Sequence, residues 1–246
     1  MTEFWHRHLL PRLNSALRRC GYRLDVVDFD HVLRTRLLLR GARDFFFIQV
    51  GAFDGVSHDP ITRYIERFDL RGVLIEPQPQ PFARLAENYR DHRRLTLVNA
   101  AVAEAEGTRD FFTVRAGVPG MPEWSQQLAS FDRNNILKHR DGIPVHGVPR
   151  IPDIEQHIEV QPVRCLTFNR LLDDAKVSSV DLLQIDAEGY DVELLKAFPF
   201  ERLKPAIIRY EHMHVAAEAQ RACVARLEGL GYRVISERSD TYAYLR

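Results

Sequence analysis

Two predicted strands of this chain each end in a tight turn that combines glycine with acidic side chains. Phe45–Val50 runs into Gly51-Ala-Phe-Asp-Gly55, and Asp181–Asp186 runs into Ala187-Glu-Gly-Tyr190. Ligands of open parallel sheets bind at the carboxyl ends of the strands. The two turns therefore predict one shared ligand-binding cleft in an α/β domain.

Composition narrows the class of partner. The chain has 246 residues, 45% of them hydrophobic, which is enough for one large α/β domain with a full core. Basic and acidic residues balance at 34 each, so no global field attracts nucleic acid or an anionic membrane. No apolar run reaches membrane-spanning length, so no stable membrane insertion is expected. A small molecule or another protein is the expected partner.

The three cysteines indicate the compartment. Cys20, Cys165 and Cys223 are odd in number, widely spaced and set among apolar residues. This arrangement suits buried thiols better than disulfides or a zinc site. A reducing compartment follows, and we expect the protein in the cytoplasm.

Residues 1–43 are predicted to form an N-terminal helical extension, and residues 44–246 the main domain. Apolar side chains recur in the extension at helical spacing, with arginines between them, at Phe4, Trp5, Leu9, Leu10, Leu13 and Leu17. The pattern favours a packing or dimerisation helix over a membrane-surface helix. A homodimer is compatible with it.

From residue 45, apolar strands alternate with amphipathic helices, which is typical of a parallel sheet covered on both faces. Strands are predicted at 45–50, 73–75, 95–98, 182–185 and 205–210, and a closing hairpin at 232–235 and 242–245. Helices are predicted at 59–68, 82–89, 168–172, 192–198 and 216–230. Residues 108–114 and 160–165 read as further extended segments. Residues 115–158 are rich in glycine and proline and predict an irregular lid over the substrate.

The first acidic turn and the next strand end indicate a nucleoside ligand. Gly51 and Gly55 allow a sharp bend, but Phe53 stands where a dinucleotide fingerprint requires its second glycine. Glu76 ends the next strand, in position to accept the hydroxyls of a ribose. S-adenosylmethionine, a nucleoside without a pyrophosphate, fits such a site, whereas nicotinamide and flavin dinucleotides do not.

Later strand ends carry the candidates for chemistry. Asp186 and Glu188 are separated by one residue, and Glu211 and His212 follow the next strand. A histidine beside a carboxylate is a common general base for a hydroxyl group. The same groups also suit a divalent metal, and the two alternatives stay open. His58 and His139, each judged alone, are expected to be surface residues.

Four motifs in order resemble the FkbM-type S-adenosylmethionine-dependent methyltransferases, over about residues 44–215. They are Gly51-Ala-Phe-Asp-Gly-Val-Ser-His-Asp-Pro60, Leu74-Ile-Glu-Pro77, Leu183-Gln-Ile-Asp-Ala-Glu-Gly-Tyr-Asp191 and Ile207-Ile-Arg-Tyr-Glu-His212. Ser130-Phe131 and Lys138-His139 resemble the middle region of that family. The resemblance implies a class I, Rossmann-like methyltransferase fold: a seven-stranded sheet with helices on both faces and the last strand antiparallel. It also implies O-methylation of a sugar, polyketide or similar hydroxyl.

The resemblance also implies which residues face the cofactor. It places the cofactor S-adenosylmethionine against Gly51, Ala52, Asp54, Gly55, Glu76, Pro77, Asn99, Ala100 and Asp186. The catalytic candidates are His212, Asp186, Glu211 and Glu188, with Asp186 and Glu211 as ligands if Mg²⁺ takes part; the resemblance does not assign their individual roles. Gln49 stands where related sequences often carry an acid, so one contact to the cofactor is expected to differ.

Two other functions compete with this one. A nicotinamide-dependent oxidoreductase uses a related sheet, and Phe53 argues against it. A non-catalytic scaffold that binds a nucleoside or a partner protein is the other alternative, and the retained Asp186 and His212 make it less attractive.

Overall fold

The computed structural model describes residues 27–141, 151, 153–237 and 239–245. The predicted helix at residues 4–17, with its role in dimerisation, and Cys20 lie outside these residues. The chain divides into two compact units, residues 1–35 and residues 36–246. Helix α3 (Phe29–Arg40) crosses the boundary, and every strand belongs to the second unit. In the described part of the chain, no helix combines the length and the apolar character that crossing a membrane requires.

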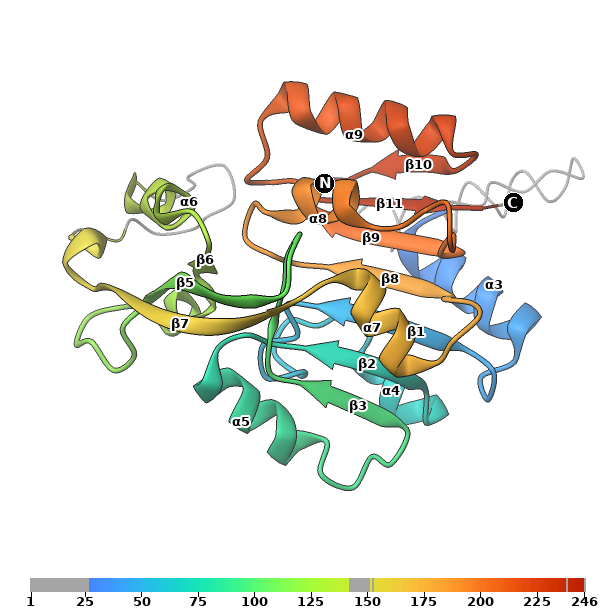
Figure 1. Cartoon of the computed structure of the whole chain (residues 1–246), viewed down its shortest axis with the longest axis horizontal. Helices are drawn as coiled ribbons and strands as arrows, with labels where there is room; N and C mark the ends of the chain where they lie inside the picture. Colours follow the sequence, from blue (N-terminus) through green and yellow to red (C-terminus); the bar gives the residue numbers. More distant parts are fainter. Residues whose placement is uncertain (1–26, 142–150, 152, 238, 246) are drawn as a thin grey trace, which may run out of the picture. The chain divides into compact units, whose positions relative to one another are not determined.

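The second unit is built on a seven-stranded sheet of order β10-β11-β9-β8-β1-β2-β3 (Figure 1). The strands are β1 (Phe46–Val50), β2 (Arg71–Ile75), β3 (Leu95–Val98), β8 (Leu182–Ile185), β9 (Ile207–Glu211), β10 (Arg233–Ser236) and β11 (Asp240–Tyr244). Neighbours from β3 to β9 pair in parallel, and β11 pairs antiparallel with both β9 and β10. The predicted fold class, with its reversed last strand, is confirmed.

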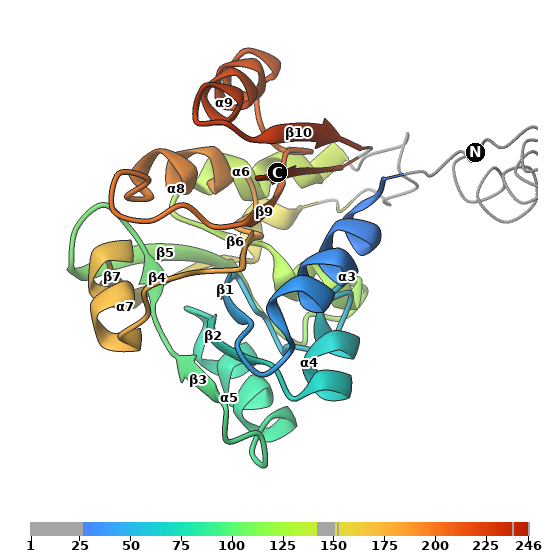
Figure 2. The same ribbon diagram turned by 90° about the vertical axis from the view of Figure 1, so that its right-hand side faces the viewer.

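The central strand β1 is buried along its whole length because helices cover both faces of the sheet. Phe46, Ile48 and Val50 belong to the main hydrophobic cluster. That cluster includes residues of α7 (Phe168–Ala175), α8 (Asp191–Ala197) and α9 (Ala217–Gly229). Helices α4 (Thr62–Phe68) and α5 (Pro79–Asn88) cover the opposite face (Figure 2). The buried thiols Cys165 and Cys223 are free, as predicted.

Helices α4 and α5 both begin at residues other than those predicted. α5 begins at Pro79, where the missing N–H and fixed φ of proline are tolerated. α4 begins at Thr62, three residues later than the predicted start at Asp59. Asp59 is therefore free to direct its carboxylate towards the strands beside it.

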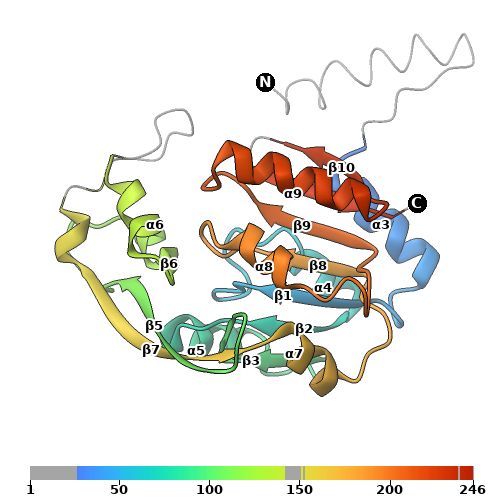
Figure 3. The ribbon, with the colours of Figure 1, turned by 45° about the horizontal axis from the view of Figure 1, so that its top comes forward.

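A second, four-stranded sheet of order β4-β7-β5-β6 follows β3 in the chain. It consists of β4 (Ala101–Val102), β5 (Gly107–Val114), β6 (Ala129–Ser130) and β7 (Ile158–Leu166). β6 lies in the segment predicted to be irregular, together with η2 (Glu123–Gln127), α6 (Arg133–Leu137), η3 (Lys138–Asp141) and η5 (Ile154–Gln156). These short elements enclose a small core of their own, formed by Val114, Leu128, Ile136, Ile151 and Ile154. The second sheet and α6 lie beyond the carboxyl ends of the main strands (Figures 1 and 3).

Candidate functional site

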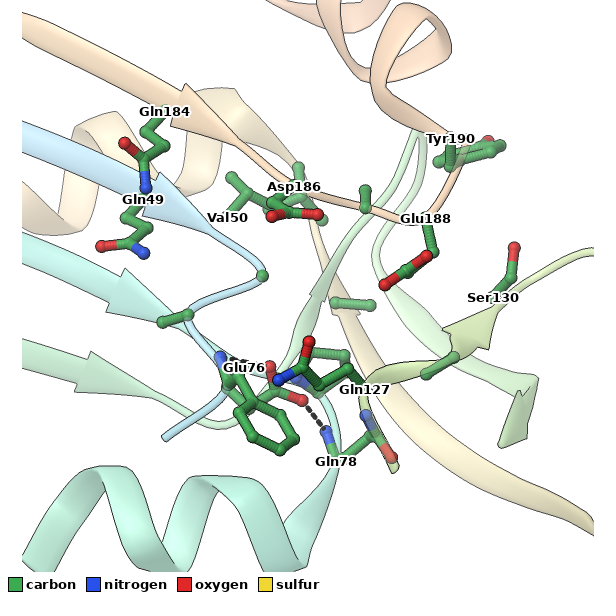
Figure 4. Close-up of a pocket in the computed structure, with 18 of the residues that line it drawn as sticks. Gln49, Val50, Glu76, Gln78, Gln127, Ser130, Gln184, Asp186, Glu188 and Tyr190 are labelled. Atoms are coloured by element: carbon green, nitrogen blue, oxygen red, sulfur yellow. Dashed lines mark hydrogen bonds between the residues drawn. The ribbon is translucent and has the colours of Figure 1, made fainter. Parts of the chain in front are cut away.

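A cavity opens at the carboxyl ends of β1, β2 and β8 (Figure 4). The space between its walls amounts to about 900 Å³, including open solvent at the mouth. The sheet side of its lining includes Gln49, Gly51, Ala52, Phe53, Glu76, Pro77, Asp186 and Glu188. The second sheet and its connections contribute Ala101, Val102, Phe111, Gln127, Ser130 and Phe131.

The first glycine of the β1 turn is fixed by close backbone packing. Gly51 has φ +78°, and its N–H, like that of Ala52, donates to the Ile75 carbonyl oxygen at 3.0 Å. A Cβ atom on Gly51 would lie 1.8 Å from the Asp186 carbonyl oxygen. Only glycine therefore allows the β1 and β8 turns to meet at the floor of the cavity.

Gly55 and Asp54 shape the same turn without lining the cavity. A Cβ atom on Gly55 would meet Leu85 of α5 and the ring of Tyr89. Asp54 accepts hydrogen bonds from the N–H groups of Val56 and Ser57 and from the Ser57 hydroxyl. Partial burial by itself would raise the pKa of Asp54, but these hydrogen bonds outweigh it and lower the pKa below its usual value. A contact between Asp54 or Gly55 and a cofactor stays a prediction.

Glu76 lies buried at the end of β2, only 3% exposed, with both oxygens held by backbone donors (Figure 4). One oxygen accepts from the N–H of Phe53 at 2.9 Å, and the other from the N–H of Gln78 at 2.8 Å. Burial raises the pKa of Glu76 to about 7 in spite of these two hydrogen bonds. Each oxygen keeps a further lone pair for a donor in the cavity. Sequence reasoning missed Phe53 and Gln78, because a backbone donor leaves no mark in the residue type.

The residues after β3 divide between the cavity and the core. Asn99 donates its side-chain amide to the carbonyl oxygens of Glu76 at 2.8 Å and Pro77 at 3.1 Å, and so joins the ends of β2 and β3. Ala100 is 1% exposed and belongs to the main core. Neither residue lines the cavity, whereas the following Ala101 and Val102 do. The predicted adenine contact of Asn99 and Ala100 stays a prediction.

Asp186 and Glu188 direct their carboxylates into the cavity from the end of β8 (Figure 4). Desolvation raises the pKa of Asp186 to about 6, although Arg209 opposes the shift. Asp186 is exposed to water in the open cavity, and this exposure weakens the desolvation that raises its pKa. Desolvation and the charge of Asp186 raise the pKa of Glu188 well above its usual value.

His212 does not line the cavity. Its Nδ1 lies 3.0 Å from the Thr241 hydroxyl oxygen on β11, and its backbone N–H donates to the Ser239 carbonyl oxygen. Burial lowers the pKa of His212. The general-base role predicted for His212 stays untested, and the geometry places other groups nearer the cavity.

Asp191 lies fully buried behind the β8 turn, and Glu211 lies half-buried beside it. Asp191 accepts from the N–H groups of Ala187 at 3.3 Å, Gly189 at 3.2 Å and Glu211 at 3.1 Å, so it ties the β8 turn to the end of β9. Burial and the neighbouring carboxylates raise the pKa of Glu211 to about 10. The sequence offered Asp191 only as part of a matched motif, not as a connecting residue.

Asp59 brings a carboxylate next to the side chain of Gln49. Its carboxylate accepts from the side-chain amides of Gln49 at 3.0 Å and Gln184 at 3.3 Å. All three residues line the cavity. Burial raises the pKa of Asp59 against these hydrogen bonds. An acidic group near the first strand is thus delivered from the turn after it.

Aromatic rings form the wall opposite the sheet. Phe131 contacts Phe111 with ring centroids 4.9 Å apart and Tyr190 with centroids 5.6 Å apart, both edge to face. The guanidinium of Arg109 lies 4.2 Å from the centroid of the Phe131 ring. The three rings come from β5, the segment after β6 and the β8 turn. No spacing in the sequence predicts that they meet.

The two histidines that were expected at the surface differ in their burial. His58 is exposed, as expected, and lines the cavity. His139 is 4% exposed, and burial lowers its pKa to about 4. The ring of His139 lies against the ring of His214, with centroids 4.6 Å apart, and both imidazoles approach Glu188. The expectation of a surface residue is wrong for His139, because the small core of the insertion holds η3 against the β8 turn.

A family model described as the methyltransferase FkbM domain matches residues 49–234, well over half of the chain. None of the curated proteins compared with the chain matches it. Solved structures give likenesses of low identity. The precorrin-6y C5,15-methyltransferase of Geobacter metallireducens GS-15 is 16% identical over 90% of each chain, with a TM-score of 0.42. The methyltransferase FkbM of Methylobacillus flagellatus KT is 14% identical over 81% of this chain and 43% of that chain, with a TM-score of 0.45.

An RNA methyltransferase of Salinibacter ruber, in complex with S-adenosyl-L-homocysteine, is 11% identical over 90% of this chain and 92% of that chain, with a TM-score of 0.36. TM-scores below 0.5 add nothing to the assignment. The fold rests on the strand order and pairing, and the family on the match over residues 49–234.

Proposed function

The chain belongs to the FkbM family of methyltransferases, and from this premise we propose that it transfers a methyl group from S-adenosylmethionine to a hydroxyl oxygen of a small molecule. The observation that carries the proposal is the cavity itself. Glu76 stands at one end of it, with two oxygens fixed by backbone donors, and Asp186 and Glu188 stand at the other.

The charge of the lining fits this donor. Among the described residues that line the cavity there is no Lys or Arg, and Glu76, Asp186 and Glu188 are acidic. A pyrophosphate would lack a counter-charge here, which disfavours nicotinamide dinucleotides. Glu76 can accept two neighbouring ribose hydroxyls with its remaining lone pairs. When bound, S-adenosylmethionine supplies a methyl group on a positively charged sulfur.

Methyl transfer requires that an acceptor oxygen be aligned and lose its proton. In this proposal Asp186 accepts that proton while the oxygen bonds to the methyl carbon, and the electron pair of the broken carbon–sulfur bond stays on sulfur. A pKa near 6 suits the role, since a general base works best when its pKa lies near the working pH. Asp186 lines the cavity and His212 does not, so this proposal assigns the general base to Asp186 and not to His212.

The aromatic wall favours an acceptor with a ring. Phe111, Phe131 and Tyr190 offer apolar edges and faces to such a compound, and the Ser130 hydroxyl lies beside them. A polyanionic acceptor such as RNA is disfavoured, because no described cation lines the cavity and the net charge is zero. The buried free thiols Cys165 and Cys223 support a cytoplasmic location for this activity.

Calorimetry with S-adenosylhomocysteine tests the cofactor site. We expect binding by the wild type and by the control Glu66→Ala, whose side chain is exposed on α4, and at least tenfold weaker binding by Glu76→Ala. Absence of binding by the wild type would overturn the proposal. Equal affinity in all three proteins would remove Glu76 from the site.

Turnover on a panel of hydroxyl compounds, followed by mass spectrometry of methylated products, tests the base. Asp186→Asn should lower kcat about 100-fold or more, as loss of a general base does, while the affinity for S-adenosylhomocysteine changes little. His212→Ala should keep kcat within a few fold. If His212→Ala lowered kcat more than Asp186→Asn does, the general base would be His212 and not Asp186.

A further inference from the structure

Four side chains that do not contact one another by hydrogen bonds converge beside the cavity. His139 comes from η3, Glu188 from the β8 turn, and Glu211 and His214 from the end of β9 and the segment after it. One ligand atom each of His139, Glu188 and His214 lies within 4.8 Å of the others. The side chains of His139 and His214 are 5% and 6% exposed, so their meeting is a buried arrangement and not a solvated surface cluster.

The distances between these atoms are too long for hydrogen bonds. Nε2 of His139 and Nε2 of His214 each lie 3.9 Å from the same oxygen of Glu188, and Nε2 of His214 lies 3.8 Å from an oxygen of Glu211. An ion bound at about 2.1 Å holds tetrahedral ligands about 3.4 Å apart. The gaps of 3.8 and 3.9 Å would close by about 0.4 to 0.5 Å on such an ion, and the widest gap among His139, Glu188 and His214, which is at most 4.8 Å, by up to about 1.4 Å.

Charge is out of balance at the same place. Glu188 and Glu211 share the approach to His214, with Asp186 and Asp191 close enough to raise their pKa values. One oxygen of Glu211 is buried without a hydrogen-bond partner in the part of the chain that the structure describes. Lys138 directs its ammonium to the Asn135 amide oxygen at 2.7 Å and the His214 carbonyl oxygen at 3.3 Å. Each of the two glutamates faces the imidazole of a histidine at 3.8 or 3.9 Å.

From this geometry we propose that His139, Glu188, His214 and Glu211 bind one divalent transition-metal ion, of the class of Zn²⁺, Co²⁺ or Mn²⁺. Two imidazoles with two carboxylates suit these ions, whereas Mg²⁺ prefers an all-oxygen site. The set keeps Glu211 from the predicted Mg²⁺ ligands and replaces Asp186 with Glu188 and two histidines.

Glu188 also lines the cavity, so the ion would lie at its edge. An acceptor hydroxyl that joined the ion as a fifth ligand would have its pKa lowered, and Asp186 would receive its proton more readily. This catalytic role rests on the proposed function, whereas the metal site does not.

The test uses the full chain, stripped of metal with a chelator, and Co²⁺ or Zn²⁺ as the probe. Titration with Co²⁺, followed by its visible absorption, reports the number of ions bound and their geometry. Metal analysis after dialysis against Zn²⁺ gives the stoichiometry independently. The variants are His139→Ala, His214→Ala and the nearly isosteric Glu211→Gln, with His31→Ala, an exposed residue of α3, as the matched control.

We expect one equivalent of metal in the wild type and in His31→Ala, at least 100-fold weaker binding in both cluster histidine variants, and at least tenfold weaker binding in Glu211→Gln. If a histidine variant fails to fold, two other results test the site. They are the metal affinity of Glu211→Gln and a metal-dependent rise of the wild-type Tm. No stoichiometric binding by the wild type, or equal affinity in all variants, overturns the site. Binding of S-adenosylhomocysteine is measured on the same proteins. A wild type that binds S-adenosylhomocysteine but no metal refutes the metal site alone, whereas one that binds metal but no S-adenosylhomocysteine refutes the proposed function alone.

Discussion

The contact between the β1 and β8 turns predicts a large cost for a single methyl group. In Gly51→Ala the added Cβ would lie 1.8 Å from the Asp186 carbonyl oxygen and 2.9 Å from its carbonyl carbon. Both are backbone atoms at the ends of central strands, so no side-chain rotation relieves the overlap. The residue also has φ +78°, which disfavours alanine.

The two contributions can be separated in magnitude. A left-handed backbone costs a residue other than glycine about 1–2 kcal/mol, and overpacking at a buried site costs about 1–3 kcal/mol more. We therefore expect Gly51→Ala to lower the free energy of unfolding by roughly 2–5 kcal/mol. The matched control is Gly41→Ala, since Gly41 has φ +80° and no atom within 4 Å of the added Cβ. The control should cost only about 1–2 kcal/mol.

Equilibrium unfolding in urea, followed by tryptophan fluorescence and circular dichroism, measures both variants. If Gly51→Ala and Gly41→Ala lose the same free energy, backbone conformation alone explains the glycine, and the close approach of the two turns is refuted. A larger loss in Gly51→Ala, with weaker S-adenosylhomocysteine binding, would show that the same contact shapes the floor of the cavity.

Two further predictions follow from buried carboxylates. The folded-state pKa of Glu76 is raised from 4.5 to about 7. The protonated form therefore stabilises the fold fully below about pH 4.5, and this contribution to the free energy of unfolding is lost as the pH rises to about 7. The loss amounts to roughly 3 kcal/mol. Urea unfolding at pH 5 and pH 8 should show this pH dependence reduced in Glu76→Gln, and an unchanged pH dependence contradicts it. Asp181 is fully buried and accepts from Arg36 at 2.7 Å and from the N–H of Phe46 at 3.0 Å. Asp181→Ala should cost about 3 kcal/mol, because buried donors lose their partner, whereas Asp173→Ala, which removes an exposed pair with Arg202, should cost less than about 1 kcal/mol. Similar losses of unfolding free energy in the two variants would show that the buried contacts of Asp181 stabilise the fold no more than an exposed ion pair does.

The sequence predicted the main sheet because its signals are local. A buried strand such as 46–50 is apolar except at Gln49, and the helical spacing of apolar residues after residue 81 predicted most of α5, which begins three residues earlier at Pro79. Glu76, Asp186 and Glu188 could be placed at the cavity because the end of a strand fixes where the next residue lies. The arrangement of the sheet therefore explains why the strands and these three carboxylates could be predicted from the sequence.

What the sequence did not predict depends on contacts between distant segments. The four-stranded sheet pairs β5 with β7 across more than 40 residues, and its core uses scattered aliphatic residues without a period. Asp54 looked like a ligand contact, yet its oxygens are used by the turn that contains it. A residue type at a strand end tells what chemistry is available, but only the hydrogen bonds around it tell which lone pairs remain.

The distribution of carboxylates over the strand ends explains how one edge of a sheet can separate two tasks. Glu76 at the end of β2 is held by two backbone donors and presents fixed acceptors, as recognition of a ligand requires. Asp186 and Glu188 at the end of β8 lie among other acids, so their protonation responds to whatever enters the cavity. The second sheet and its connections add to the responsive end, since they deliver Phe131 to its wall and His139 to Glu188. Variation in that segment should therefore change the acceptor and the protonation of the β8 turn, and leave the two backbone hydrogen bonds that hold Glu76 in place, since these come from Phe53 and Gln78.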